Sequence, residues 1–246
     1  REEFEITMLK QTARAGLIAA LMVSTAALAK APQAEVAKLG ANGTPLTPVG
    51  AERAGNKDGT IPEWKGGITQ PVSGYKVGDH HPDPFPNDKV KFTIDGKNYK
   101  QYAEHLSAGQ IAMFEKYPNW RMPVYETRRS ASFPQRTYEM TLKNAATGEL
   151  TNDGEGVANV AEGFPFPILD KDPAKAGMEA IWNHKLKFKG VAFARWNNQA
   201  MPTATGQYTL IRFREEGLGL YYKPGNTLKD INNILLYFYE EVVAPP

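Results

Sequence analysis

The second half of the chain contains four segments rich in β-forming residues, separated by short connections. These segments are Leu186–Arg195, Gln207–Arg214, Leu218–Tyr222 and Asn233–Val243. Two parallel strands must be joined by a crossover of a dozen or more residues, usually a helix. The connections between these segments leave no room for crossover helices, so the segments predict a strongly curved antiparallel sheet.

Helix signals precede and interrupt these strands. Asp172 followed by Pro173 is typical of a helix start, with an N-cap acceptor and proline at the first helical position. Ser107 and Gln110 have capping-box spacing, and that helix should end at Pro118. Further strand signals cover Met122–Arg129, Thr137–Lys143 and Val157–Val160. The predicted fold class is therefore α+β, a curved antiparallel β-sheet against two or three helices.

Composition excludes several classes of protein. The chain has 246 residues, 41% of them hydrophobic, and a formal net charge of +2. The absence of cysteine excludes disulfides, thiolate metal sites, a cysteine nucleophile and a lipid anchor on an N-terminal cysteine. Basic residues are interspersed with acidic ones and form no block, which argues against nucleic acid as a partner.

The N-terminal region has the pattern of a secretory signal peptide over Met8–Ala29. Lys10 and Arg14 supply the positive region, and Ala15–Val23 is uncharged and apolar but too short to span a bilayer. Small residues before the end of this segment predict cleavage after Ala29. Arg1–Thr7 precede the signal and are interpreted as a non-native start. We therefore expect an exported, periplasmic protein.

Residues 30–88 are rich in proline and glycine and predict an extended N-terminal segment, whereas 89–246 should form the curved-sheet domain. Within the extended segment, Gly50–Gly67 has neither helical nor strand periodicity and predicts an ordered loop that packs through a tryptophan. Its structural residues are taken to be Arg53, Asn56, Asp58, Glu63 and Trp64.

Two segments have a superficial likeness to metal sites. Ala54–Lys65 resembles a calcium-binding EF-hand loop, but alanine and lysine occupy the first and last positions, where Ca²⁺ requires carboxylates. An Asx-turn in which Asp58 makes a turn hydrogen bond is the preferred interpretation. Neighbouring His80 and His81 point opposite ways in an extended chain and do not chelate together easily. We expect neither a metal nor a cofactor.

No catalytic motif is present. The sequence lacks a nucleophile elbow, a zinc-protease helix and a phosphate-binding glycine loop. Glu52, Asp58 and Glu63 are the clustered carboxylates, and the adjacent pair Glu215–Glu216 is interpreted as a solvated edge. A non-enzymatic protein is therefore favoured, and an enzyme acting on envelope polysaccharide is the least favoured alternative.

Phe164-Pro165-Phe166-Pro167 is the most unusual apolar run. Because proline has no N–H, such a segment can line a pocket with fewer unpaired donors. Phe164, Phe166, Trp182 and Trp196 are therefore the candidate ligand-binding residues. Ordinary core packing is the favoured explanation for them, and the ligand-binding interpretation is the alternative.

Several stretches together resemble the domain of unknown function 1329 family. They are Leu46–Gly67, Phe85–Tyr117, Met122–Arg129, Ala161–Ile168 and Gly177–Lys187, so the resemblance extends through nearly all of Leu46–Pro246. It implies the fold of outer-membrane lipoprotein carriers and receptors, in which a half-open, curved antiparallel β-sheet wraps over helices and leaves an apolar cavity. Members of that family continue beyond this chain, so we expect an incomplete, truncated sheet.

Three functions are compatible with these observations. The first is a non-enzymatic periplasmic binding or carrier protein for an apolar small molecule or lipid. The second is an interaction or assembly protein of an envelope transport system, with an envelope transporter or outer-membrane protein as partner. The third is the polysaccharide-acting enzyme.

Overall fold

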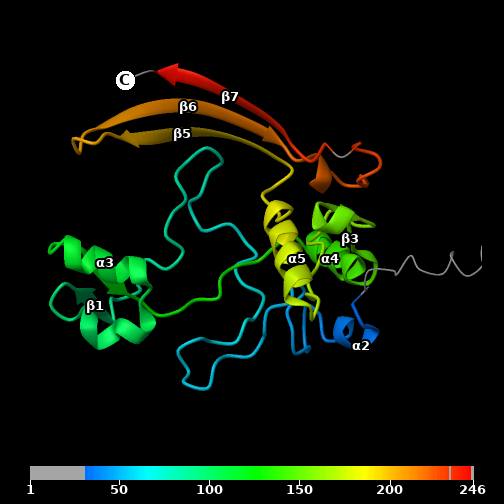
Figure 1. The fold of residues 1–246 in the computed structure, drawn as a ribbon, viewed down its shortest axis with the longest axis horizontal. Coiled ribbons are helices and arrows are strands. Elements are labelled where there is room, and N and C mark those ends of the chain that lie inside the picture. Colours follow the sequence, from blue (N-terminus) through cyan, green and yellow to red (C-terminus); the bar gives the residue numbers. More distant parts are fainter. Residues whose placement is uncertain (1–30, 233, 245–246) are drawn as a thin grey trace, which may run out of the picture. The chain divides into compact units, whose positions relative to one another are not determined.

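The computed structural model describes residues 31–232 and 234–244. Its described part contains helices and open antiparallel sheets, which confirms the predicted α+β class (Figure 1). Two compact units are present. Residues 31–40, 48–50 and 135–244 form the first, called the sheet unit, and Ala41–Thr47 with Ala51–Pro134 form the second, called the loop unit.

The predicted boundary between 30–88 and 89–246 lies inside the loop unit, whereas the chain passes into the sheet unit between Pro134 and Gln135. The predicted signal peptide Met8–Ala29 and the Arg1–Thr7 start lie outside the described residues.

A three-stranded antiparallel sheet dominates the sheet unit. Its strands are β5 (Ala192–Pro202), β6 (Tyr208–Leu218) and β7 (Tyr237–Ala244), in the order β5-β6-β7. The strands are long and curve gently in Figure 1. Antiparallel pairing is confirmed for both neighbouring pairs. The connection between β5 and β6, residues 203–207, is too short for a parallel crossover.

The helices of the sheet unit are α2 (Gln33–Val36), α4 (Gln135–Thr147) and α5 (Pro173–Lys185). Between the last two, the antiparallel pair β3 (Glu149–Thr151) and β4 (Gly156–Ala158) is joined through the 3₁₀ turn η2 (Asn152–Gly154). The predicted start of α5 is confirmed: Asp172 accepts the N–H of Ala174 at 3.0 Å, and Pro173 is the first helical residue.

The prediction of a strand over Thr137–Lys143 is wrong, because these residues lie in α4. Threonine and tyrosine favour strands in isolation, but tertiary contacts override that preference. Thr137, Thr141 and Asn144 are buried at helical spacing. Thr141 Oγ1 donates to the Thr137 carbonyl at 2.7 Å and accepts the N–H of Phe164 at 3.0 Å. A polar face of α4 is thus buried against the segment after β4.

Two strand predictions near the sheet also require correction. Leu186 lies before β5, and 220–222 form the 3₁₀ turn η3 (Leu220–Tyr222) after β6. The reason is a hydrophobic cluster at the base of the sheet. Its buried members are Val160, Leu186, Tyr221, Tyr222 and Ile231. Burying these side chains together takes their backbone out of the sheet.

The loop unit contains a small hairpin-like pair, β1 (Phe92–Asp95) and β2 (Arg121–Val124), joined by the 3₁₀ helix η1 (Tyr99–His105) and by α3 (Ala108–Lys116). The predicted capping box at Ser107 and Gln110 is confirmed, with both reciprocal hydrogen bonds present. Ile94, Tyr99 and Phe114 form the buried cluster of this unit.

Hydrogen bonds of Trp64 and Arg129 link the segment Ala51–Gly67 to residues far along the chain within the loop unit. Trp64 is 7% exposed, and its indole N–H donates to the Ala131 carbonyl at 3.0 Å. Arg129 donates to the carbonyl oxygens of Glu52 at 2.7 Å and Arg53 at 2.9 Å. This irregular loop is therefore ordered through contacts with residues far along the chain.

Candidate functional site: an apolar pocket at the base of the sheet

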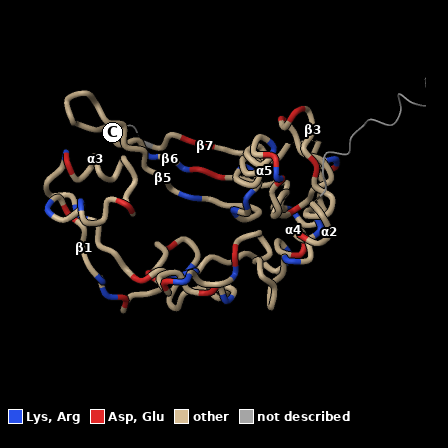
Figure 2. Tube along the Cα trace, turned by 60° about the horizontal axis from the view of Figure 1, so that its bottom comes forward, with Lys and Arg blue, Asp and Glu red and all other residues tan. Residues whose placement is uncertain are grey.

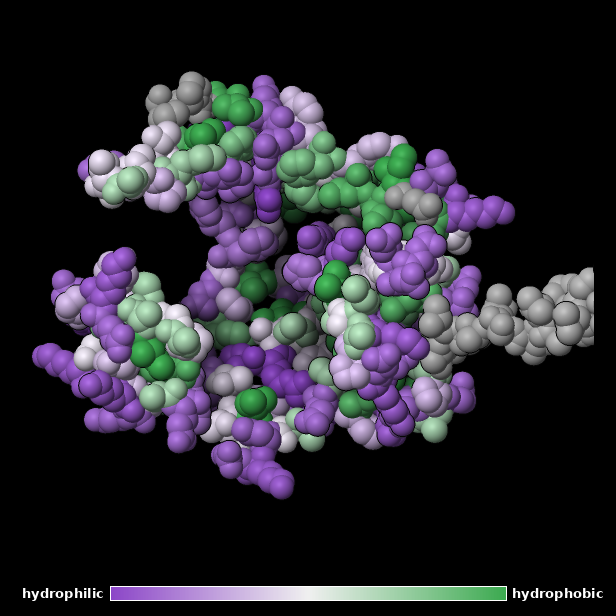
Figure 3. All heavy atoms as spheres, in the orientation of Figure 1, coloured by the Kyte–Doolittle hydropathy of each residue, from purple (hydrophilic) through white to green (hydrophobic). Residues whose placement is uncertain are grey.

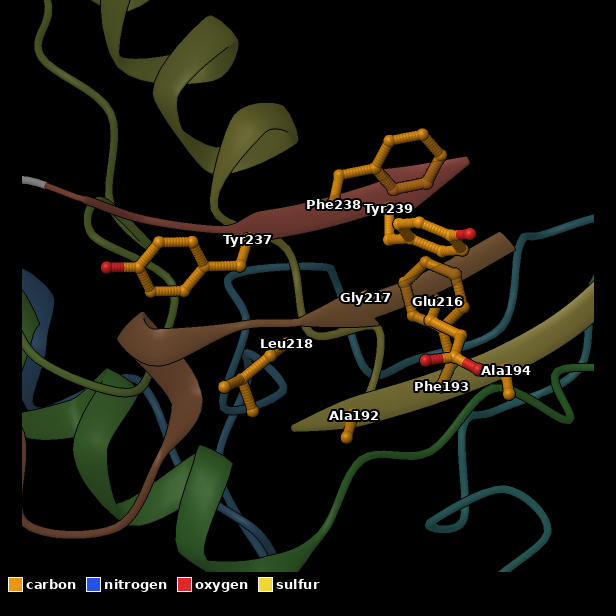
Figure 4. A pocket seen from close by; sticks show the side chains of 9 residues that line it. All are labelled: Ala192, Phe193, Ala194, Glu216, Gly217, Leu218, Tyr237, Phe238 and Tyr239. Atoms are coloured by element: carbon orange, nitrogen blue, oxygen red, sulfur yellow. The ribbon is translucent and has the colours of Figure 1, made fainter. Parts of the chain in front are cut away.

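The strand register divides the side chains of the sheet between two faces. Phe193 of β5, Gly217 of β6 and Phe238 of β7 are directly paired across the three strands and lie on the same face. Ala192 and Leu218 are the neighbouring pair on the opposite face. Figure 4 shows this division, with Phe193 and Phe238 on one side of the ribbon and Ala192 and Leu218 on the other.

The absence of a side chain at Gly217 leaves the space that the Phe193 ring occupies. A Cβ atom built at Gly217 would lie 2.3 Å from the Phe193 ring, closer than carbon atoms approach one another. The ring therefore packs directly against the β6 backbone at this point. Glycine in a strand often marks such a close approach, so this aromatic contact explains why position 217 is a glycine.

A pocket of about 520 Å³ opens on this face where the sheet begins. It is formed by the end of α5, the connection to β5, η3 and the start of β7. The lining residues are Lys185, Leu186, Lys187, Lys189, Gly190, Phe193, Arg195, Gly219, Tyr221, Tyr222, Leu235, Leu236 and Phe238. Figure 3 shows hydrophobic side chains reaching the surface in this part of the sheet unit.

The inner part of the pocket is made by the buried cluster at the sheet base. Leu186, Tyr221 and Tyr222 belong both to that cluster and to the pocket lining. The Phe188 ring packs edge-on against Tyr222 at a centroid distance of 5.1 Å. Such packing places rigid aromatic walls beneath the more exposed Leu236 and Phe238.

Three lysines also line the pocket. Along Lys185-Leu186-Lys187-Phe188-Lys189, burial alternates: the lysines are exposed, whereas Leu186 and Phe188 pack into the base cluster. Lys185 Nζ lies 4.1 Å from the centre of the Trp182 ring, a cation–π contact. Three of these ammonium-bearing side chains therefore line one apolar pocket.

Arg195, the fourth cationic residue of the lining, already has a partner. Its guanidinium is paired with Glu215, directly opposite on β6. Asn197 donates to the same carboxylate at 3.0 Å. Hydrogen bonds from Asn197 and Arg195 hold the pKa of the Glu215 carboxyl below its usual range. The interpretation of Glu215 as a solvated edge is thus wrong, because this carboxylate is buried and paired.

Burial also affects the two tyrosines of the lining. It raises the pKa of both Tyr221 and Tyr222, so their hydroxyls remain neutral at physiological pH. Tyr221 donates to the Gly163 carbonyl at 2.7 Å. The inner wall therefore carries no charge, and the charges of the pocket are those of the basic side chains.

The four predicted ligand-binding residues are not brought together. Trp182 packs beside the base cluster and donates to the Gly154 carbonyl at 2.9 Å. Trp196 is 58% exposed on β5, with the Arg212 guanidinium 4.6 Å from its ring centre. Phe164 is half-buried next to α4. Phe166 lines a different, smaller pocket. That the four residues bind one ligand together stays a prediction.

The pocket beside Phe166 has a volume of about 290 Å³ and lies among α2, α4 and α5. Both backbone groups of Phe166 are bonded by the Asn183 side chain, at 2.9 and 2.7 Å. Glu179 also lines this pocket and accepts the N–H of Asp170 at 2.6 Å. Burial raises the pKa of the Glu179 carboxyl above its ordinary value.

The predicted loop residues lie in the loop unit. Asn56 closes this segment with its side chain, whose oxygen accepts the N–H of Ile61, five positions on, at 2.8 Å. Asp58 and Glu63 are exposed, and Asp58 has no hydrogen bond or ion pair to another described residue. The turn hydrogen bond expected of Asp58 therefore belongs to Asn56. Glu52 and Glu63 line a shallow depression that Asp58 does not share.

Sequence reasoning missed Lys187 and Lys189 as pocket residues because their alternation with Leu186 and Phe188 was read as a strand. The same alternation could have identified them. It places charged and apolar side chains on opposite sides of the segment, whether or not the segment pairs with a neighbouring strand. Basic and acidic residues are otherwise interspersed along the described chain (Figure 2).

Comparison with known proteins places this architecture in a family. Residues 93–246 match the family described as "Protein of unknown function (DUF1329)". The chain belongs to the DUF1329 family. The resemblance inferred from the sequence motifs is thereby confirmed.

This DUF1329 chain is 37% identical over 236 residues to a relative from Pseudomonas aeruginosa strain PAO1, named "Uncharacterized protein PA3922". The match covers 94% of this chain and 49% of the relative, so the chain spans about half the relative's length. No solved structure matches the chain significantly. Among the described residues, no helix has the length and apolar character needed to cross a membrane.

Proposed function

We propose that this DUF1329 member is a non-enzymatic binding or carrier protein for an apolar ligand or lipid, which binds in the pocket at the base of the sheet. The single observation that supports this most directly is the combination of Phe193, Leu236 and Phe238 at the mouth with buried aromatic rings beneath them. Small-molecule sites are mostly apolar concavities of about 300–1,000 Å³, a range that includes this pocket.

Apolar side chains of the pocket lining are exposed to water in the absence of a ligand. Leu236 and Phe238 are each 50% exposed. Covering such side chains gains about 25 cal/mol per Å² of apolar area removed from water, so a ligand that covers both would be stabilised by their burial. Exported proteins meet such ligands at the cell envelope, and the signal-peptide pattern over Met8–Ala29 supports a periplasmic location.

An interaction or assembly role is the second candidate. It is supported by the opposite face of the sheet, where Trp196, Tyr208, Leu210, Tyr237 and Tyr239 are all exposed. Tyrosine and tryptophan are enriched in protein–protein interfaces. A partner in the envelope, such as a transporter or outer-membrane protein, would cover this face and leave the base pocket free.

A matched pair of leucine variants tests the binding role. Leu236 and Leu210 are 50% and 48% exposed, but only Leu236 lines the pocket. Binding of an environment-sensitive apolar fluorophore is titrated on the wild type, Leu236→Gln and Leu210→Gln. We expect Leu236→Gln to weaken binding several-fold and Leu210→Gln to leave it unchanged, with melting temperatures controlling for folding.

The purified protein is also extracted with organic solvent, and the extract is analysed by mass spectrometry. A co-purifying apolar molecule that is lost from Leu236→Gln and retained by Leu210→Gln would support the carrier role. Absence of fluorophore binding to the wild type, or equal binding by both variants, would contradict the base pocket as the site and favour the interaction role.

A further inference from the structure

We infer that the ligand of the base pocket is an anionic amphiphile, whose apolar chain lies on Phe193, Leu236 and Phe238 and whose negative head group lies against Lys187 and Lys189. This inference rests on the proposed function and specifies the chemistry of its ligand. It follows from the distribution of charge around the pocket.

The charge around the pocket has one sign. Of the described residues that line it, Lys185, Lys187, Lys189 and Arg195 are cationic and none is acidic. The whole chain is nearly balanced, with 29 basic and 27 acidic residues. A local excess of this kind is therefore not a consequence of overall composition. Low-dielectric walls beside such a group of charges strengthen its attraction for an anion.

The four cations differ in how much of their charge is available. Arg195 is paired with Glu215, and Lys185 lies over the Trp182 ring. Lys187 and Lys189 have no ion-pair partner within the described part of the chain, and both are exposed. They are thus the two side chains free to meet a negative group at the mouth.

The chain geometry links the charged and apolar halves of the site. Lys187 and Lys189 flank Phe188, whose ring packs on Tyr222 beneath the pocket. The connection 186–190 then leads into β5 and to Phe193 on the pocket face. One short segment therefore supplies both the ammonium groups and the apolar wall. A neutral apolar ligand would use the wall alone, whereas an anionic amphiphile would use both.

The shared chemistry is a carboxylate or phosphate on an acyl chain, which a free fatty acid or an anionic phospholipid can supply. Three probes carry the same lauroyl chain and separate these possibilities. They are laurate, lauroyl-lysophosphatidylglycerol and lauroyl-lysophosphatidylcholine, of which the last has no net charge. Their affinities are measured by calorimetry below their critical micelle concentrations, at low and at high salt.

We expect the anionic probes to bind on the order of tenfold more tightly than the lysophosphatidylcholine at low salt, since one charge-assisted contact gives about that factor. Added salt should reduce this preference, because the lysines are exposed. Tighter binding of laurate alone, or of the lysophosphatidylglycerol alone, would assign the head group to a fatty acid or to a phospholipid, respectively, and would support the inference.

The double variant Lys187→Gln/Lys189→Gln should lose most of the preference and keep its affinity for the lysophosphatidylcholine. The control is Lys143→Gln/Lys229→Gln, which removes two exposed lysines of the same unit that do not line the pocket. It should retain the preference.

Two results would overturn the inference. Equal affinity of the wild type for all three probes would be consistent with the proposed binding function but would contradict an anionic ligand. If Lys187→Gln/Lys189→Gln kept the full preference for the anionic probes, these lysines would not contact the head group. Failure of every probe to bind would instead contradict the proposed function itself.

Discussion

Tyr221 and Tyr222 are consecutive, buried and perpendicular to each other, but only one of their hydroxyls is satisfied. Their ring centroids lie 5.0 Å apart at an interplanar angle of 88°. The Tyr221 hydroxyl donates to the Gly163 carbonyl, whereas the Tyr222 hydroxyl is buried with no hydrogen-bond partner among the described residues. A buried hydroxyl without a partner costs free energy. Removing the hydroxyl oxygen by Tyr→Phe should therefore change the free energy of unfolding in opposite directions at the two positions.

Tyr222→Phe should leave the free energy of unfolding unchanged or raise it by up to about 1 kcal/mol, because it removes an unsatisfied polar group. Tyr221→Phe should lower it by about 1–2 kcal/mol, because the Gly163 carbonyl loses its donor. Urea unfolding of the two variants makes the comparison, and each serves as the other's control. Equal destabilisation by both would contradict the assignment of the hydrogen bond to Tyr221 alone.

Glu162 should make the free energy of unfolding depend on pH, with stability lost under acidic conditions. Burial raises the pKa of this carboxyl, but hydrogen bonds from Arg136 and the Gly225 N–H outweigh burial, so the pKa lies below its ordinary value. The stabilisation is fully present above the ordinary value of 4.5 and is lost as pH falls through the lower folded value. Glu162→Gln should therefore reduce stability at neutral pH by about 1–3 kcal/mol.

The measurement is chemical unfolding at a series of pH values, and the difference between wild type and Glu162→Gln should shrink on acidification. Glu216→Gln, which alters an exposed pair with Arg214, is the control and should have little effect. A difference that stays constant from neutral to strongly acidic pH would show that the charge of Glu162 is not what stabilises.

Glu179 should have the opposite dependence. Since burial raises its folded pKa, the folded state binds the proton more tightly than the unfolded state, and stability falls as pH rises from the ordinary value through the raised one. Glu179→Gln keeps an oxygen that can accept the Asp170 N–H but removes the buried charge. It should raise the melting temperature at neutral pH and have no effect well below pH 4.5. A lower melting temperature at neutral pH would contradict this.

Trp64 should be the main contributor to the stability of the loop over Ala51–Gly67. Its ring is buried, with the Arg53 guanidinium 5.2 Å from the ring centre. Trp64→Ala should cost about 3–5 kcal/mol, the usual loss for a buried aromatic side chain. Asp58→Ala, at an exposed position of the same loop, should change stability by less than about 0.5 kcal/mol. Thermal unfolding of both variants tests this, and a larger loss for Asp58→Ala would contradict it.

The parts of the fold that follow local rules could be predicted from the sequence. The helix start at Asp172 and the capping box at Ser107 depend on residues three or fewer positions apart, and both are present. The short connection between β5 and β6 was enough to predict that these two strands pair antiparallel. The family could be inferred because several motifs occur in one order along the chain.

Features that depend on distant partners could not be predicted. Thr141 lies in a helix, where its hydroxyl accepts the N–H of Phe164, 23 positions away along the chain. Tyr221 leaves the sheet to reach Gly163, 58 positions away. Phe164, Phe166, Trp182 and Trp196 were grouped by residue type alone. Their positions depend on separate contacts with α4, Asn183, Gly154 and Arg212.

Arg129 gives the Ala51–Gly67 loop an internal counterpart of a bound cation. Calcium-binding loops are organised by an ion that draws several oxygens toward one positive centre. In this loop, the carbonyl oxygens of Glu52 and Arg53 converge instead on a guanidinium supplied from more than seventy residues downstream. That positive centre is covalently part of the polypeptide, so it arrives with folding of the unit and is always present at one equivalent. The shape of this loop is thereby coupled to synthesis of the downstream chain.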